Sequence, residues 1–283
     1  MAEIAREAGE LLRSYFRGGW FVPESSANIN SEAQRHVRVE YKGEVDVVTE
    51  ADRRSEALIV ERIRDRWPTH DILGEEGTHT KTGSEFRWYV DPLDGTTNFA
   101  HGYPVFAVSL GLARGNELIA GVVYDPTRDE MFAAEKGSGA WLNERRISVS
   151  PIKSLGESLL ATGFPSQKRH KNPNIHFYQR LTLRSHGVRR AGSAALDLAN
   201  VACGRYDGFW EFNLNPWDTA AGVVLVREGG GIVTDFRGGD FDLASREVCG
   251  SNRHIHSALL YEFEQVFAGK DLEPLPSPAE YRH

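Results

Sequence analysis

The sequence predicts a mixed α/β protein that forms one domain with two unlike halves. Up to about residue 150, short apolar strands follow one another with tight turns between them, which is typical of antiparallel pairing. From about residue 151, strand-like and helix-like segments alternate, which indicates layered α/β structure. No internal repeat or flexible linker divides the sequence. We therefore expect residues 1–283 to form a single domain, with halves at 1–150 and 151–283.

The first half is expected to begin with two helices. Residues 2–17 place apolar side chains at helical spacing, opposite Arg and Glu. Residues 18–36 are rich in Gly, Pro, Ser and Asn and predict a loop. A second helix is predicted after Thr49, which is a favourable capping residue. Trp67-Pro68 should end it, because the residue before a proline avoids helical backbone angles.

Short strands and turns make up the rest of the first half. Arg114-Gly115-Asn116 and Asp125-Pro126 are turn sequences between apolar runs, so the flanking strands should pair antiparallel. Strands are predicted at 45–48, 71–74, 88–90, 105–112, 117–124 and 130–135.

The second half should alternate between the two kinds of element. A helix is expected to start at Ser193, and another at Pro216, because proline is favoured in the first helical turn. The small residues that follow Asp218 allow close packing against a neighbour. Strands are predicted at 159–162, 188–190, 206–212 and 232–234, and helices at 172–185, 193–203 and 216–228.

Composition narrows the class of protein. A net charge of −7 argues against general nucleic-acid binding, because phosphate backbones select basic surfaces. The one basic run, residues 168–171, is expected to be a solvated loop. The two cysteines do not have the spacing of metal ligands. With no signal-like start and no apolar run near the ~20 residues of a membrane span, we expect a cytoplasmic protein without a membrane partner.

One stretch, Trp88 to Phe99, carries the clearest chemical signal. A buried strand is expected to break at Pro92 and Gly95, with Asp91 and Asp94 at the break. The following Gly95-Thr96-Thr97-Asn98 has the character of a helix N-terminus, where free N–H groups attract phosphate. Carboxylates beside such amides indicate metal-assisted phosphoryl chemistry. Asp-Pro and Asp-Gly are also ordinary turn pairs, and Thr and Asn are ordinary caps, so the residues alone leave both interpretations open.

Three segments in order resemble the inositol monophosphatase family of lithium-sensitive, magnesium-dependent phosphatases. They are WYVDPLDGTTNF at 88–99, LGEEG at 73–77 and NPWDTAAG at 215–222. The order and separations fit from about Lys42 to about Gly250. The resemblance implies the layered αβαβα sandwich of the inositol monophosphatase and fructose-1,6-bisphosphatase type.

The resemblance also implies a metal site made of oxygen ligands. Such ligands select two or three Mg²⁺ ions, with Mn²⁺ a possible substitute. Taken alone, Glu75 could belong to a solvated loop and Asp218 could be a first-turn helix acid. The implied metal ligands are Glu75, Asp91, the Leu93 carbonyl, Asp94 and Asp218.

The implied catalytic residues are Thr96, Asp52 and Glu75. Thr96, supported by Asp52, would orient and deprotonate a water, and the Gly95 and Thr96 amides would hold the phosphate. Asp52 alone could equally be a first-turn helix acid. The equivalents of Lys42 and Asp46 lie near the metals in the family. No pattern of a covalent phosphatase or of a serine hydrolase accompanies these residues.

Substrate contacts are expected from the second half, together with Asp94 and Asp218. Gly192-Ser193-Ala194 resembles the segment that touches polyol hydroxyls. Glu211 matches the family's inositol-binding glutamate, and a carboxylate suits two adjacent hydroxyls. The alternative for Glu211 is an exposed acid at the end of a strand.

The implied function is hydrolysis of inositol monophosphate to inositol and phosphate. The metal motifs do not separate this substrate from fructose 1,6-bisphosphate, histidinol phosphate or adenosine 3′,5′-bisphosphate. A non-catalytic regulatory scaffold on the same fold is the alternative from another class. Lithium sensitivity and a homodimer are expected from the resemblance.

Overall fold

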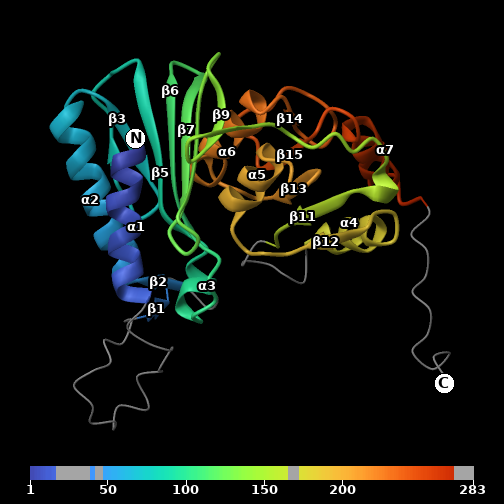
Figure 1. Ribbon diagram of the computed structural model, residues 1–283, viewed down its shortest axis with the longest axis horizontal. Coiled ribbons are helices and arrows are strands. Elements are labelled where there is room, and N and C mark those ends of the chain that lie inside the picture. Colours follow the sequence, from blue (N-terminus) through green and yellow to red (C-terminus); the bar gives the residue numbers. More distant parts are fainter. Residues whose placement is uncertain (17–38, 42–46, 165–171, 271–283) are drawn as a thin grey trace, which may run out of the picture.

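Five layers stack in the computed structural model, which describes residues 1–16, 39–41, 47–164 and 172–270. Helices, a large sheet, helices, a small sheet and helices follow one another across the molecule (Figure 1). The predicted αβαβα sandwich is therefore confirmed. None of the helices in the described ranges combines the length and apolarity that crossing a membrane requires.

The large sheet has the strand order β10-β9-β8-β7-β6-β5-β3-β4. Its neighbours pair antiparallel, except β3 and β5, which are parallel. This confirms the antiparallel character predicted for the first half. The bounds are β3 (Asp71–Gly74), β4 (His79–Thr80), β5 (Phe86–Asp94), β6 (Ala107–Arg114), β7 (Glu117–Asp125), β8 (Glu130–Glu135), β9 (Gly139–Leu142) and β10 (Arg145–Ile147).

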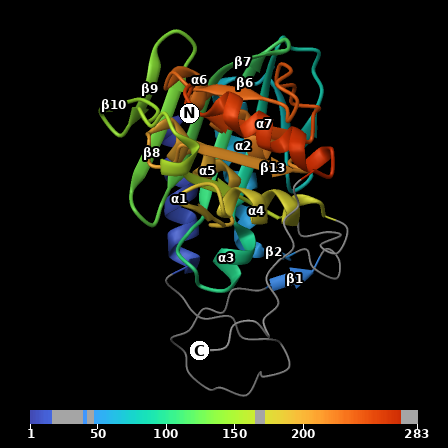
Figure 2. The same cartoon turned by 90° about the vertical axis from the view of Figure 1, so that its right-hand side faces the viewer.

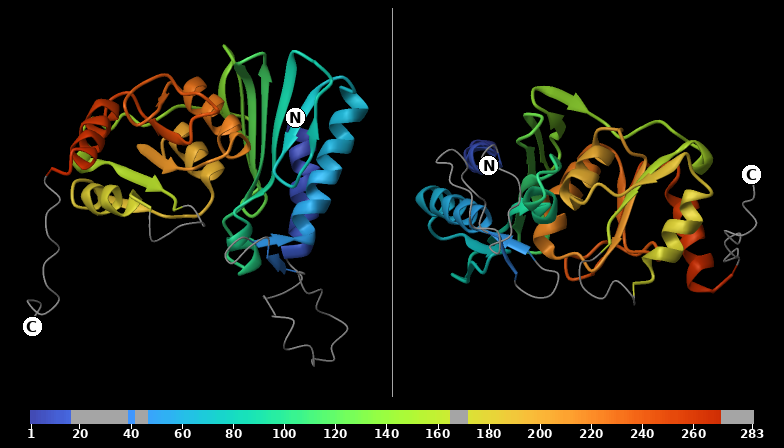
Figure 3. Two further views of the ribbon diagram at one scale, coloured as in Figure 1. Left: turned by 180° about the vertical axis from the view of Figure 1, so that it is seen from behind. Right: turned by 90° about the horizontal axis from the view of Figure 1, so that it is seen from below.

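Two long helices cover the outer face of this sheet, α1 (Ala2–Phe16) and α2 (Glu50–Arg66) (Figure 3). Both lie where the apolar spacing predicts them, and α2 ends just before Trp67-Pro68. β1 (Val39–Tyr41) and β2 (Val47–Thr49) form a separate antiparallel pair that leads into α2. The loop predicted at 18–36 lies outside the described residues.

The small sheet has the order β12-β11-β13-β15-β14. α5 (Ala194–Ala202) and α6 (Pro216–Glu228) lie between the two sheets (Figure 1). α4 (Asn174–Thr182) and α7 (His256–Phe267) cover the outer side, which faces the viewer in Figure 2. The other elements are β11 (Leu159–Thr162), β12 (Gly187–Arg189), β13 (Gly208–Phe212), β14 (Ile232–Thr234), β15 (Glu247–Ser251), α3 (Thr96–Ala100) and the short 3₁₀ helix η2 (Leu155–Glu157).

The central strand β5 differs from its prediction. It does not break at Pro92 but continues to Asp94, with a shift in its register against β6 between Asp91 and Asp94. Proline has no N–H to donate to a ladder, and a bulge accommodates it without ending the strand. The chain turns only at Gly95, whose φ of 101° is in the left-handed region.

Close packing of α6 on the large sheet depends on two glycines. A Cβ atom added to Gly111 would lie 2.5 Å from the Cβ of Ala220, and one added to Gly121 would lie 2.5 Å from the Ala221 carbonyl oxygen. The small residues of α6 pack against these glycines, as the sequence predicts. The first turn of α6, with Asp218, is thereby held against the large sheet.

One apolar cluster joins the layers. It contains Val123 and Phe132 from the large sheet, Leu198 and Leu225 from the central helices, and Phe209 from the small sheet. The assignment of residues 1–283 to a single domain stays a prediction, and this shared core is consistent with it.

We expect Gly121→Ala to lower the free energy of unfolding by about 1–3 kcal/mol, because the new methyl group would overlap backbone atoms of α6. Guanidinium denaturation measures this change. Gly156→Ala is the matched control, since the nearest atom to its added Cβ, the Ser154 Oγ, is 3.6 Å away. Equal stability of the two variants would contradict close packing at Gly121.

Candidate active site

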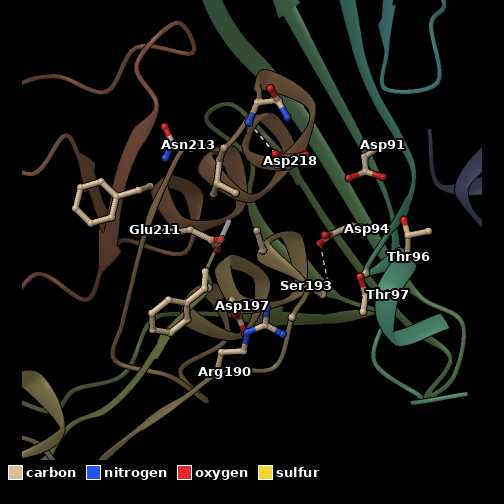
Figure 4. A pocket seen from close by; sticks show the side chains of 18 of the residues that line it. Asp91, Asp94, Thr96, Thr97, Arg190, Ser193, Asp197, Glu211, Asn213 and Asp218 are labelled. Atoms are coloured by element: carbon tan, nitrogen blue, oxygen red, sulfur yellow. Dashed lines mark hydrogen bonds between the residues drawn. The ribbon is translucent and has the colours of Figure 1, made fainter. Parts of the chain in front are cut away.

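The predicted site residues gather around one cavity of about 590 Å³ near the carboxyl end of β5 (Figure 4). Asp52 lies beneath the cavity wall, against Thr96. Lys42 and Asp46, predicted near the site, lie outside the described residues. The predicted residues that line the cavity are Glu75, Asp91, Leu93, Asp94, Gly95, Thr96, Gly192, Ser193, Ala194, Glu211 and Asp218.

Glu75 and Asp91 come from the neighbouring strands β3 and β5. The Glu75 amide donates to the Val90 carbonyl at 3.1 Å, which extends the ladder by one bond. In the bulge, the Leu93 amide donates to Asp91 Oδ1 at 3.0 Å. The Glu75 and Asp91 side chains are close enough to share a hydrogen bond. The two acids therefore face each other at the cavity wall.

Asp94 connects the large sheet to α5. Its Oδ2 accepts hydrogen bonds from the Ser193 hydroxyl at 2.6 Å and from the Ala195 amide at 2.7 Å. Ser193 also caps α5 by accepting from the Leu196 amide at 3.3 Å. The Ser193 hydroxyl is thus occupied by protein partners, and its predicted contact with substrate stays a prediction.

Asp218 lies in the first turn of α6. Its Oδ2 accepts from the Asn215 amide at 2.7 Å, so it caps the helix as the simpler interpretation predicts. It also lines the cavity together with Asp91 and Asp94 (Figure 4). The two interpretations of this acid are therefore compatible.

Thr96 and Asp52 form the expected pair. The Thr96 Oγ1 lies 3.1 Å from Asp52 Oδ1 and 3.1 Å from the Leu93 carbonyl oxygen. Asp52 is in the first turn of α2, and its side chain is fully buried. The hydroxyl has a single hydrogen to donate, and both neighbours are acceptors. Thr96 is therefore held in a fixed orientation at the cavity wall.

Burial shifts the titration of the cavity acids in one direction. It raises the pKa of Asp94 to about 6, against the hydrogen bonds from Ser193 and Ala195 that favour its charged form. Burial likewise raises the pKa of Asp218 to about 7. The pKa values of Glu75 and Asp91 are raised well above the usual range by burial and then by neighbouring negative charge. The cavity therefore favours protons or cations bound among these acids.

The chemistry of the donors fits a hard cation. All the predicted ligands offer oxygen, which Mg²⁺ prefers, and Mg²⁺ usually takes one or two carboxylates and keeps several waters. Within the described residues, no three His, Cys, Asp or Glu side chains form a group that could hold a metal ion as placed. Glu75 and Asp91 lie next to each other, and burial with neighbouring negative charge raises both pKa values, so a cation bound there would displace protons. Two carboxylates with the Leu93 carbonyl and water would suit Mg²⁺.

The opposite wall of the cavity carries Glu211 on β13. Its side chain is 7% exposed and accepts no hydrogen bond from another described residue. Burial, followed by the charges of Asp218 and Asp94, raises its pKa well above the usual range. Glu211 is therefore not the exposed strand-end acid of the alternative interpretation.

Several wall residues were not found from the sequence. Asp197 on α5 is 1% exposed, and its Oδ1 has no hydrogen-bond partner among the described residues. Arg190 lies beside it (Figure 4) and counteracts the raised pKa values of Asp197 and Glu211. Gly163 leaves room for Glu211, since a Cβ there would lie 2.2 Å from the Glu211 oxygens. The one available signal was an acid within the otherwise apolar helix AALDLANVA.

The chain is similar to known proteins in both sequence and fold. A model of the inositol monophosphatase family matches residues 1–267. The chain is 49% identical over 225 residues, 78% of each chain, to a Synechocystis sp. protein named inositol-1-monophosphatase. It is 46% identical over 262 residues, 90% of this chain and 91% of the other, to a Pseudomonas aeruginosa protein named Nus factor SuhB.

A solved structure agrees with the sequence matches. The inositol monophosphatase from Anabaena (Nostoc) sp. superposes with a TM-score of 0.80 at 40% identity, over 93% of each chain.

The raised pKa values of Asp94 and Asp218 predict how stability depends on pH. Without a divalent cation, the folded state binds more protons than the unfolded state between about pH 4 and 7, so the contribution of these acids to stability is lost as pH rises through that window. Urea denaturation of chelator-treated protein at several pH values measures this. The double variant Asp94→Asn/Asp218→Asn should gain stability relative to the parent as pH rises. A constant difference between the two proteins would disprove the shifts.

Proposed function

This chain belongs to the inositol monophosphatase family, and we propose that it is a Mg²⁺-dependent phosphatase that hydrolyses inositol monophosphate to inositol and phosphate. The observation that carries the proposal is the composition of one cavity. Buried acids suited to cations line one wall, and on the opposite wall lies the Glu211 carboxyl, which has no hydrogen-bond partner among the described residues. A phosphate bound at the first wall would place a polyol against the second.

The metal ligands in this proposal are Glu75, Asp91, the Leu93 carbonyl, Asp94 and Asp218, for two or three Mg²⁺ ions, with Mn²⁺ a possible substitute. Bound Mg²⁺ would supply a water of lowered pKa and would stabilise charge on the leaving oxygen. Asp91, Asp94 and Asp218 each have one carboxylate oxygen engaged by a backbone or hydroxyl donor, which fixes the direction of the other. Directed oxygens of this kind are what a cation site needs.

Thr96 and Asp52 act on the attacking water. When the Thr96 hydroxyl donates to Asp52, its lone pairs accept a hydrogen bond from that water and direct the water oxygen at phosphorus. The proton can then pass through Thr96 toward the Asp52 carboxylate. The Gly95 and Thr96 amides, at the start of α3, bind phosphate oxygens.

Glu211 recognises the alcohol part of the ester. A carboxylate accepts from two neighbouring hydroxyls, which suits a polyol, and the Gly192–Ala194 segment borders the same space. The same metal chemistry would act on fructose 1,6-bisphosphate, histidinol phosphate or adenosine 3′,5′-bisphosphate. These esters are therefore the competing substrates in any assay.

The proposal extends to a lithium-sensitive homodimer in the cytoplasm. One finding favours a second candidate function, because a relative at 46% identity is named Nus factor SuhB. A regulatory role through a protein partner is compatible with phosphatase activity. Phosphate release from a panel of these esters, with and without Mg²⁺, tests the proposal. No release from any ester by a folded protein would leave only the regulatory role.

Asp91→Asn should lower kcat by orders of magnitude, because a neutral amide replaces the anionic carboxylate of a proposed metal ligand. Steady-state kinetics at saturating Mg²⁺ measures the loss, and circular dichroism checks the fold. Asp129→Asn, at an exposed turn of the large sheet, is the control and should leave kcat unchanged. Near-normal turnover by Asp91→Asn would remove this residue from the metal site.

Glu211→Ala should raise KM for inositol monophosphate and have much less effect on a simple aryl phosphate, which lacks the hydroxyls that Glu211 would accept from. The comparison of the two substrates is the measurement. Losses of equal size on both would indicate that Glu211 supports the cavity and does not recognise the polyol.

A further inference from the structure

One face of α2 carries three buried polar side chains, Asp52, Ser55 and Glu56, which are 0%, 0% and 4% exposed. Their spacing of i, i+3 and i+4 puts them on the same side of the helix. Each bonds to a different segment of the site. We propose that Ser55 and Glu56 are positioning residues, which fix Glu75 and the Asp91–Asp94 bulge relative to each other. The inference rests on the proposed function, in which those acids bind cations.

Glu56 holds the turn that directly follows Glu75. Its Oε2 accepts from the Glu76 amide at 2.7 Å, and its Oε1 accepts from the Thr78 amide at 3.0 Å and the Thr78 hydroxyl at 2.7 Å. The preceding Gly74 lets the carboxylate approach, since a Cβ there would lie 2.5 Å from Oε2. Three donors from one turn converge on a single buried carboxylate.

Ser55 holds the bulge between Asp91 and Asp94. Its hydroxyl donates to the Pro92 carbonyl oxygen at 3.0 Å, in buried surroundings. The register against β6 shifts in this interval. Ser55 therefore supplies a donor to a carbonyl within the irregular part of the strand.

The contacts of Ser55 and Glu56 lie just beyond the end of the β3–β5 pairing. The pairing of β3 with β5 ends at Gly74 and Val90, and the Glu75 amide makes the last bond. Past that point the ladder does not determine how Glu75 lies relative to Asp91. A rigid helix that bonds to both segments, and to Thr96 through Asp52, sets that relation instead. Residues that orient metal ligands in this way commonly change metal affinity by 10–100-fold when altered.

Glu56→Gln tests the inference in the full chain. The amide offers one acceptor oxygen and a donor, so it cannot accept from all three groups. We expect Mn²⁺ affinity without substrate, measured by electron paramagnetic resonance of free Mn²⁺, to fall by about 10-fold or more. The Glu76 and Thr78 amides should exchange hydrogen faster, and kcat at saturating Mn²⁺ should stay within a few-fold of the parent.

Two further variants keep the test decisive. Glu61→Gln, on the exposed side of the same helix, should leave Mn²⁺ affinity unchanged. If Glu56→Gln does not fold, Thr78→Val removes a single bond to Glu56 and should still weaken Mn²⁺ binding by several-fold. A folded Glu56→Gln or Thr78→Val protein with the parent's Mn²⁺ affinity would overturn the inference.

The outcomes separate this inference from the proposed function. A parent protein that binds Mn²⁺ but releases phosphate from no ester would end the proposed function, and weaker Mn²⁺ binding by Glu56→Gln would still support the positioning role. An active parent with an unaffected Glu56→Gln variant would end the positioning role alone. A parent that binds no Mn²⁺ would end both.

Discussion

Mutual repulsion among buried carboxylates is the constraint that this structure has to satisfy. Asp91, Asp94 and Asp218 meet it in the same way, because each lines the cavity and has one carboxylate oxygen bound to a donor of the protein. Such bonds favour the charged form, but burial outweighs them and keeps the pKa values high. The acids are thus held in fixed orientations without a positive charge to balance them. A bound divalent cation would reduce the repulsion among them.

The donors that fix these acids come from the large sheet and from both central helices. The Leu93 amide belongs to the large sheet, the Ser193 hydroxyl and Ala195 amide to the start of α5, and the Asn215 amide to the start of α6. The site therefore exists only when the central helices lie on the large sheet. Gly111 and Gly121 do not line the cavity, but their close contact with α6 holds the first turn of that helix, and so Asp218, against the large sheet.

Local sequence signals predicted the elements that are specified locally. Pro216 in the first turn and the glycines at 229–231 predicted α6 at 216–228, and the structure has those bounds. The path of β5 past Pro92 was not predictable in this way, because its contacts there are with distant residues: it pairs with β6 across a register shift, and its Pro92 carbonyl accepts from Ser55, 37 residues earlier. The strand β15 and the helix α7 were also missed, and each pairs or packs with partners far along the chain.

The same distinction applies to the site. The motifs that carry the resemblance contain the acids themselves, so the acids were found. Residues that support the acids without belonging to a motif, such as Glu56, Gly163 and Asp197, were missed, because their roles arise only from contacts with distant residues. An acid on the apolar side of a helix, as at Glu56 and Asp197, was the one signal that the sequence offered.

The opposite wall, with Glu211 and Asp197, affects which phosphate esters the cavity can bind. Burial is the largest cause of the raised pKa of Glu211 and of Asp197, and cations bound at the opposite wall would not remove it. Surroundings that disfavour a carboxylate also disfavour a second phosphate group, which carries more charge. Arg190 reduces this penalty, but it lies next to both acids and lowers their pKa values only in part. A neutral alcohol with several hydroxyls can bond to Glu211 whether that residue is ionised or protonated. These surroundings support polyol monophosphates over bisphosphates as substrates of the proposed phosphatase.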